Sequence, residues 1–152
     1  MKNERISDFM KKTLFILLVV LAAPILADDY ENGKKALKEK NYSEAVKLLN
    51  KACDGGSGGA CYTLGVLYNF GQGVKRDFDT GSKLHGKAAE LLTKECDSGS
   101  GESCFILGRM YFSGMKPVKK SWTHAKELYK KACDLKHQKA CSEYDKEFNN
   151  KK

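Results

Sequence analysis

The chain has 152 residues, 41% of them hydrophobic and 30% charged, and a formal net charge of +8 at pH 7. This length fits a single domain. The lysines are spread along the chain among many acidic residues, a pattern typical of a solvated surface and not of a nucleic-acid-binding patch. We therefore expect no nucleic-acid partner.

The N-terminal segment has the three parts of a secretory signal peptide. Basic residues come first, an apolar run follows from Thr13 to Leu21, and small residues lead to Ala27. The alternative is a membrane anchor, but the apolar run is shorter than the roughly 20 residues that a transmembrane helix needs. We predict a signal peptide over residues 1–27 with cleavage after Ala27, a secreted or periplasmic location, and no stable membrane span after cleavage.

All six cysteines fall into three pairs, with seven residues between the members of each pair. An even number of regularly spaced cysteines in an exported protein indicates disulfides. Zinc is the alternative, but structural zinc sites favour cysteines about two to four residues apart, and no histidines stand at metal-ligand spacing. We predict no metal, no cofactor and three local disulfides: Cys53–Cys61, Cys96–Cys104 and Cys133–Cys141.

Apolar residues at helical spacing predict helices in pairs between these cysteines. Lys40 and Asn41 separate the first two helices, and Ser43 is the expected N-cap of the second. The glycine-rich loop 54–59 separates the first pair from the second. We expect hairpins at about 29–53, 60–96 and 103–133, a capping helix over 140–148 and a polar tail over 149–152, so that the repeat domain spans 28–148.

The middle hairpin is longer than its neighbours. Tyr42 and Trp122 each lie eleven residues before the cysteine that ends their hairpin, whereas Phe78 lies eighteen residues before Cys96. The seven extra residues fall within 79–86 and predict either a longer helix or a bulged loop there.

Two glycines, Gly65 and Gly108, lie inside predicted helices, where a glycine costs about 1 kcal/mol. A glycine at such a position usually has a packing reason. We therefore expect the paired helix to come close to these glycines, at Ala88, Ala89 or Ala125.

A helix hairpin of roughly 36 residues cannot bury its apolar stripe alone, so stacked hairpins must form a continuous core. The sequence therefore predicts an all-α fold, an α/α hairpin solenoid with local disulfides between the hairpins. One helix of each pair in a solenoid lines a concave surface that can bind a protein or peptide. The candidate binding face consists of the first-helix positions outside the core pattern: Tyr62, Val66, Asn69, Phe105, Arg109 and Phe112. The alternative is that half of these residues belong to the core between repeats.

Two runs share the pattern L-G-x-x-Y-x-x-G, at 64–71 and 107–114, and the first continues as x-G-V-x-x-D to Asp77. They resemble the Sel-one-like repeat, a relative of the tetratricopeptide repeat. With the cysteine spacing and the export signal, the chain resembles the Helicobacter cysteine-rich protein family. The resemblance implies a secreted or periplasmic α/α superhelix that acts as a scaffold for a protein or peptide ligand, such as an envelope or host protein.

The same resemblance implies an alternative function, penicillin binding or weak β-lactamase activity on a β-lactam or a peptidoglycan-related small molecule. A serine β-lactamase needs S-x-x-K together with S-D-N and K-T-G elements. The residues from Ser113 to Lys116 match the first element but lie at a predicted turn, and the chain lacks the other two. We interpret this match as chance.

The histidines do not suggest a catalytic site either. His85, His124 and His137 lie in different hairpins, and we expect them at the surface or at helix caps. The sequence therefore leaves enzymatic activity open. A further alternative is a structural envelope protein without a dedicated ligand.

Overall fold

The computed structural model describes residues 28–149, so the predicted signal peptide over 1–27 and the end of the tail lie outside the described residues. The described chain is built from helices and contains no strand. The first helix is described over 28–38, and it precedes α2 (Tyr42–Asp54), α3 (Gly58–Phe70), α4 (Phe78–Asp97), α5 (Gly101–Ser113), α6 (Trp122–Asp134), α7 (Gln138–Tyr144) and the π-helix η1 (Asp145–Asn149).

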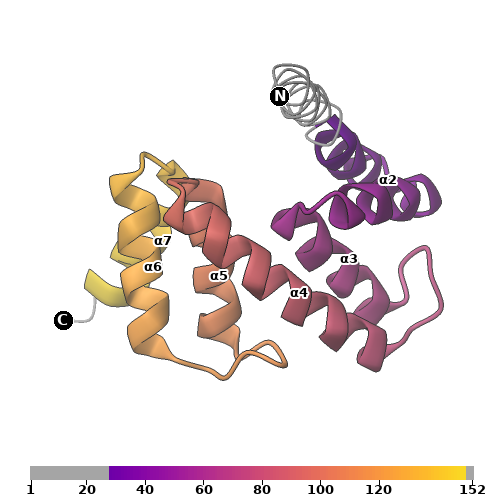
Figure 1. Ribbon diagram of the computed structural model, residues 1–152. Coiled ribbons are helices and arrows are strands. Elements are labelled where there is room, and N and C mark those ends of the chain that lie inside the picture. Colours follow the sequence, from indigo (N-terminus) through magenta and orange to yellow (C-terminus); the bar gives the residue numbers. More distant parts are fainter. Residues whose placement is uncertain (1–27, 150–152) are drawn as a thin grey trace, which may run out of the picture.

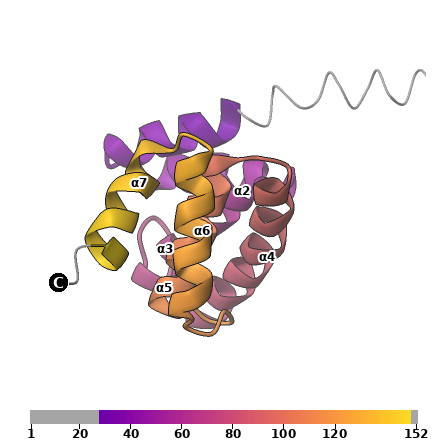
Figure 2. The same ribbon diagram turned by 90° about the vertical axis from the view of Figure 1, so that its left-hand side faces the viewer.

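The helices form pairs that follow one another along the chain (Figure 1). α3 packs on α4, and α5 packs on α6. Successive pairs meet where α2 contacts α3, where α4 contacts α5 and where α6 contacts α7. Figure 2 shows the last of these junctions, where α7 lies next to α6. The fold is therefore the predicted all-α solenoid of helix hairpins.

Short polar side chains fix where the helices begin. Asn41 caps α2, and its Oδ1 accepts a backbone N–H bond at 3.3 Å. The predicted cap at Ser43 is wrong, because the asparagine two residues earlier already fills this role. Ser57 caps α3 by accepting a bond from the N–H of Ala60 at 3.3 Å, so α3 begins at Gly58 and not at Ala60.

Three disulfides connect the hairpins, as predicted. The Cα atoms of the bonded cysteines lie 4.7, 4.7 and 4.6 Å apart, within the usual range for a disulfide. In each bond the first cysteine lies near the end of the second helix of one pair, and the second cysteine lies in the first helix of the next pair. The bonds are Cys53–Cys61, Cys96–Cys104 and Cys133–Cys141.

The extra residues of the middle hairpin lengthen its second helix. α4 has 20 residues, whereas α2 and α6 have 13 each. The difference equals the seven-residue insertion predicted within 79–86, which continues the helix without a bulge. Seven residues correspond to about two helical turns, so the face of α4 that follows the insertion keeps its orientation.

Gly65 allows a histidine ring to enter the space between α3 and α4. A methyl group at Gly65 would lie 2.5 Å from Cδ2 of His85. Close packing at Gly65 is thus present, but its neighbour is His85 and not Ala88 or Ala89. The expected surface position of His85 is also wrong, because this residue is only 1% exposed. Only a residue without a side chain leaves room for this ring.

Gly108 likewise leaves room for a ring of its paired helix, α6. A methyl group at Gly108 would lie 2.7 Å from Cδ1 of Tyr129 and 3.3 Å from Cβ of Leu128. The close neighbours of Gly108 are therefore these two residues and not Ala125. In both hairpins the glycine accommodates a large ring from the second helix.

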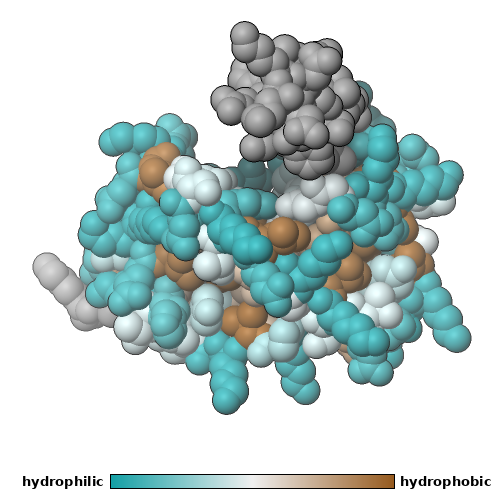
Figure 3. All heavy atoms as spheres, viewed as in Figure 1, coloured by the Kyte–Doolittle hydropathy of each residue, from teal (hydrophilic) through white to brown (hydrophobic). Residues whose placement is uncertain are grey.

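The core consists of two clusters of buried residues, and the half-buried Leu128 packs against both of them. Leucines and one methionine are fully buried, and alanines are buried where helices pack closely. Side chains with apolar character reach the surface in a broken band bordered by hydrophilic residues (Figure 3). The largest fully buried aliphatic side chains are Leu49, Leu64, Leu92 and Met110.

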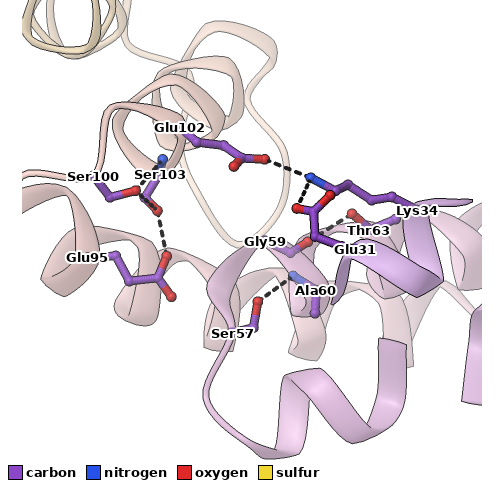
Figure 4. A network of polar contacts seen from close by, with 10 residues as sticks. All are labelled: Glu31, Lys34, Ser57, Gly59, Ala60, Thr63, Glu95, Ser100, Glu102 and Ser103. Atoms are coloured by element: carbon purple, nitrogen blue, oxygen red, sulfur yellow. Dashed lines mark hydrogen bonds and ion pairs between the residues drawn. The ribbon is translucent and has the colours of Figure 1, made fainter. Parts of the chain in front are cut away.

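The carboxylate of Glu95, near the end of α4, connects three helices, and Figure 4 shows its contact with Ser103. Its Oε1 accepts a hydrogen bond from the N–H of Gly58 at 2.8 Å, and its Oε2 accepts one from Oγ of Ser103 at 2.6 Å. Gly58 is the first residue of α3, and Ser103 lies in the first turn of α5. The carboxylate therefore satisfies a free N–H at one helix N-terminus and favourably approaches two helix dipoles.

We expect Glu95→Ala to lower the free energy of unfolding by about 1–3 kcal/mol, because it leaves the N–H of Gly58 without its acceptor and removes the charged acceptor of the Ser103 hydroxyl, whose other contact is Oγ of Ser100. Adding Ser103→Ala should recover part of this loss, since the other two junctions have alanine at both equivalent positions. Urea unfolding of the oxidised protein measures these free energies, with the exposed Glu90→Ala as control. If the loss of unfolding free energy in the double variant equalled the sum of the losses in the two single variants, this would contradict a coupling between Glu95 and Ser103.

Candidate functional site

Two adjoining cavities lie along the first helices of successive pairs. They share Tyr62 of α3, Phe105 and Arg109 of α5, and Lys139 of α7. We call the two cavities together the aromatic groove. One of them, the Phe112 cavity, has a volume of about 320 Å³ and is also lined by Phe112, Ser113, Met115, Tyr129 and Glu143. The other, the Tyr30 cavity, has a volume of about 330 Å³ and is also lined by Tyr30, Lys34, Thr63, Glu102, Ile106 and His137.

Phe105 is the central side chain of the aromatic groove. Its ring stacks on His137 with the centroids 4.8 Å apart, and it lies 5.5 Å from the ring of Tyr129. The cationic groups of Arg109 and Lys139 lie 6.0 and 5.8 Å from the ring centroid. These contacts hold the ring between α5, α6 and α7, although the residue itself is only 5% exposed.

An aromatic cluster supports the Phe112 end of the groove. The Phe112 ring lies 4.7 Å from Trp122 and 6.3 Å from Tyr129. Phe148, in the π-helix η1, adds edge contacts at 6.0–6.4 Å to all three rings. Because aromatic pairs of this kind add to the energy of burial, the last helical turn of the described chain holds this wall of the groove in place.

Ionic contacts support the Tyr30 end. Lys34 forms ion pairs with Glu31 at 2.6 Å and with Glu102 at 3.4 Å, and the second pair joins the first helix to α5 (Figure 4). Tyr30 packs against Gly59, where an added methyl group would lie 2.7 Å from the phenol oxygen. The first helix is thereby fixed against both α3 and α5.

Two tyrosines of the groove, the half-buried Tyr30 and the buried Tyr129, keep their protons. Burial and the Glu102 carboxylate raise the pKa of Tyr30 to about 12, against the opposing effect of Lys34. Burial also raises the pKa of Tyr129 to about 12, which the Arg109 charge opposes. Both phenols are therefore neutral at physiological pH and present hydroxyl groups as hydrogen-bonding partners.

The structure brings most of the predicted binding residues together. Tyr62, Phe105 and Arg109 line both cavities of the groove, and Phe112 lines one of them. Asn69 lines a separate cavity. The half-buried Val66 lines none of these cavities. A binding role for these residues stays a prediction.

The groove residues that sequence reasoning missed include Tyr30, Tyr129, Lys139 and Glu143. They come from other repeats than α3 and α5 or from the second helix of a pair, and only the stacking of the hairpins brings them to the groove. Tyr30 offered one usable signal. It precedes Gly33 by three residues, as Tyr62 precedes Gly65 by three.

A third cavity, of about 330 Å³, lies beside the groove and shares Met115 with the Phe112 cavity. We call it the His85 cavity. Burial lowers the pKa of His85, while backbone groups of Tyr62 and Lys116 favour its charged form. Its Nε2 atom is buried without a hydrogen-bond partner among the described residues. The cavity is lined by Asn69, Phe78, Ser82, His85, Met115 and Lys116.

The other two histidines stand at helix caps, as expected. Nδ1 of His124 lies 2.8 Å from Oγ of Ser121, the N-cap residue of α6. Nδ1 of His137 accepts a hydrogen bond from the N–H of Ala140 at 3.2 Å and caps α7. These contacts give both rings a structural role.

The helix pairs correspond to a known repeat. A family model described as Sel1 repeat matches residues 25–57, 59–91 and 101–137, which together make up most of the chain. The chain belongs to the Sel1 repeat family. Each repeat covers one helix pair: the first helix with α2, α3 with most of α4, and α5 with α6.

Curated relatives come from Helicobacter pylori. A segment is 48% identical over 44 residues to "Putative beta-lactamase HcpC", which is 29% of this chain and 15% of that protein. A segment is 42% identical over 45 residues to "Putative beta-lactamase HcpE", which is 30% of this chain and 13% of that protein. The matched segments thus span a small part of these relatives.

Solved structures of Sel1 repeat proteins are also similar. A Sel1 repeat protein from Oxalobacter formigenes has 25% sequence identity and a TM-score of 0.54, with 78% of this chain and 47% of that chain covered. Helicobacter pylori cysteine rich protein B has 27% identity and a TM-score of 0.43, with 77% of this chain and 92% of that chain covered. The first of these likenesses supports the solenoid fold.

The described residues contain no cluster of three or more histidine, cysteine or acidic side chains that is arranged to hold a metal ion. Among the described helices, none combines the length and the apolar character needed to cross a membrane.

We expect the free energy of unfolding to decrease as the pH falls below about 6.5, the usual pKa of histidine. Because burial lowers the pKa of His85 in the folded protein, the unfolded chain binds this proton more tightly, and acidification favours unfolding. Replacing His85 by Gln should reduce this acid dependence. Urea unfolding at pH 7.5 and at pH values down to about 4.5 measures the effect.

The control is His124→Gln, which changes an exposed histidine of α6. It should keep the acid dependence of the unmodified protein. An unchanged pH dependence in the His85→Gln variant would show that burial of this ring has no part in the acid response.

Proposed function

We propose that the protein is an exported scaffold, stabilised by disulfides, that binds an extended segment of a partner protein in the aromatic groove. The observation that carries this proposal is that Tyr62, Phe105, Arg109 and Lys139 are shared by two adjoining cavities. A segment lying across these residues can place one side chain in each cavity. Aromatic side chains and arginine contribute strongly to protein interfaces, so these residues suit this role.

The binding face extends beyond the groove in this proposal. Phe112 forms one end, where its contacts with Trp122 and Tyr129 keep the ring in a fixed position. Asn69 contributes through the His85 cavity, which borders the groove at Met115. Repeat solenoids commonly present such extended surfaces, which take an elongated ligand better than a compact one.

Export is supported by the disulfides and by the predicted signal peptide. Disulfides persist in the periplasm and outside the cell, whereas cytosolic reductants keep thiols reduced. All six cysteines of the chain are used in the three bonds. We therefore propose a periplasmic or secreted protein, with an envelope or host protein as its partner.

We expect Phe105→Ala to weaken peptide binding about tenfold or more, because it removes the central ring of the groove. Peptides are first selected from a random heptapeptide library with the oxidised full chain. Fluorescence polarisation then gives the dissociation constants of the selected peptides for the unmodified protein and for each variant.

Phe70→Ala is the matched control, since this phenylalanine is 71% exposed and lies outside the groove. It should bind as the unmodified protein does. Tyr62→Ala provides a second variant, and circular dichroism checks that each variant is folded. Unchanged affinity in both groove variants would place the binding site elsewhere.

The names of the Helicobacter pylori relatives raise an alternative, penicillin binding or weak β-lactam hydrolysis. Ser113 is the residue to test, because it begins the S-x-x-K match. It is the last residue of α5, and its hydroxyl donates a hydrogen bond to the Arg109 carbonyl at 2.8 Å. A nucleophilic serine needs an adjacent base, and this hydroxyl instead bonds to its own helix.

We therefore expect no covalent adduct and no turnover that depends on Ser113. The oxidised full chain and its Ser113→Ala variant are incubated with a penicillin and with a chromogenic cephalosporin. Intact mass and absorbance are then recorded, with a reduced sample as control. An adduct that disappears in the variant would establish an acyl-enzyme and make the alternative the main function.

A further inference from the structure

We propose that the aromatic groove selects a peptide with an acidic side chain, aspartate or glutamate, at its centre, and that Arg109 and Lys139 bind this carboxylate beside the Phe105 ring. This inference rests on the proposed function and adds the chemical class of its ligand. It concerns the side chain of an internal residue and not the C-terminal carboxylate of a peptide.

The charges of Arg109 and Lys139 are not neutralised by any ion pair among the described residues. Lys34, the third cation of the groove, is paired with both Glu31 and Glu102. Arg109 and Lys139 form no ion pair with any described residue. Both side chains are exposed, so neither charge is buried and both can reach a ligand.

The two cations converge on one place. Arg109 comes from α5 and Lys139 from α7, and both line the two cavities of the groove. Their charged groups lie 6.0 and 5.8 Å from the centroid of the Phe105 ring. A carboxylate next to this ring is therefore within the reach of two donors. Guanidinium binds carboxylate through two parallel hydrogen bonds, and the ammonium group adds a point charge.

Acidic residues at the two ends of the groove limit where the ligand carries its charge. Glu102 lines the Tyr30 cavity, and Glu143 lines the Phe112 cavity. Glu143 forms no ion pair with a described residue and repels a second carboxylate in the Phe112 cavity, whereas Lys34 and Glu102 neutralise each other in the Tyr30 cavity and leave no charge there for a second carboxylate to pair with. Unfavourable contacts of this kind set specificity. The ligand that fits therefore has one central acidic residue. Apolar or aromatic side chains on its two sides enter the Tyr30 cavity and the Phe112 cavity. A polyanion does not meet this requirement.

The test uses an array of acetylated and amidated heptapeptides. The central residue is fixed as Asp, Glu, Asn, Gln, Lys or Arg, and the other positions hold mixtures. Labelled, oxidised full chain should bind the Asp and Glu pools about tenfold more strongly than the Asn and Gln pools, as expected for two partly exposed charge pairs. The blocked termini exclude a contribution from a terminal carboxylate.

Three variants assign this preference to the groove. Arg109→Gln with Lys139→Gln should abolish the preference for acidic pools. Arg109→Glu with Lys139→Glu should reverse it towards the Lys and Arg pools. Lys35→Gln with Lys126→Gln removes two exposed lysines that lie outside the groove and make no ion pair with a described residue, and it should keep the preference.

The outcomes separate this inference from the proposed function. Binding that needs Phe105 but is equal for Glu and Gln pools would overturn the acidic specificity and leave the peptide groove intact. An acidic preference that the Lys35 and Lys126 double variant also loses would mean unspecific charge attraction, and would overturn the inference too. No binding to any pool would overturn both proposals.

Discussion

The cysteine spacing constrains how every hairpin meets the next. Each disulfide closes a ring across residues eight apart, and the N-cap of the following helix lies inside this ring, at Ser57, Ser100 and His137. In the loop-entropy model such a ring contributes about 2.5 kcal/mol. The cap fixes the helix start and the disulfide fixes its distance from the preceding helix, so together they set the direction of each new pair. Without this constraint, hairpins with a small core would have few contacts to hold their stacking.

The middle hairpin is the part of the repeat that varies. Its junction has Glu95 and Ser103 where the other two junctions have pairs of alanines, and its second helix is seven residues longer. The added turns also contain His85, which fills the space at Gly65. The spacing of the neighbouring cysteines is nevertheless the same as in the other repeats. The disulfides therefore tolerate a change in helix length and a change from apolar to polar packing.

Regular features of the fold could be predicted, whereas contacts between hairpins could not. The cysteine pattern and the helical periodicity gave the disulfides, the helix pairs and the position of the insertion. Asn41 and Ser43 are both good caps two residues apart, so the sequence did not decide between them. The burial of His85 depends on a glycine of another helix. Tyr30 and Lys139 reach the groove only because hairpins stack with a curvature that no local pattern contains.

The groove and the disulfides are linked through the chain itself. Tyr62 and Phe105 each follow directly the second cysteine of a disulfide, Cys61 and Cys104. Both lie in the shared part of the groove, and the position of the backbone beneath each ring is thus fixed by a covalent bond. One turn later in the helices the equivalent residues are Val66 and Arg109, and only the arginine lines the groove. In these two repeats the residue next to the cysteine therefore supplies an aromatic surface, whereas after Cys141 this position is Ser142. The position one turn later differs in charge between the two repeats, and it gives the groove its arginine.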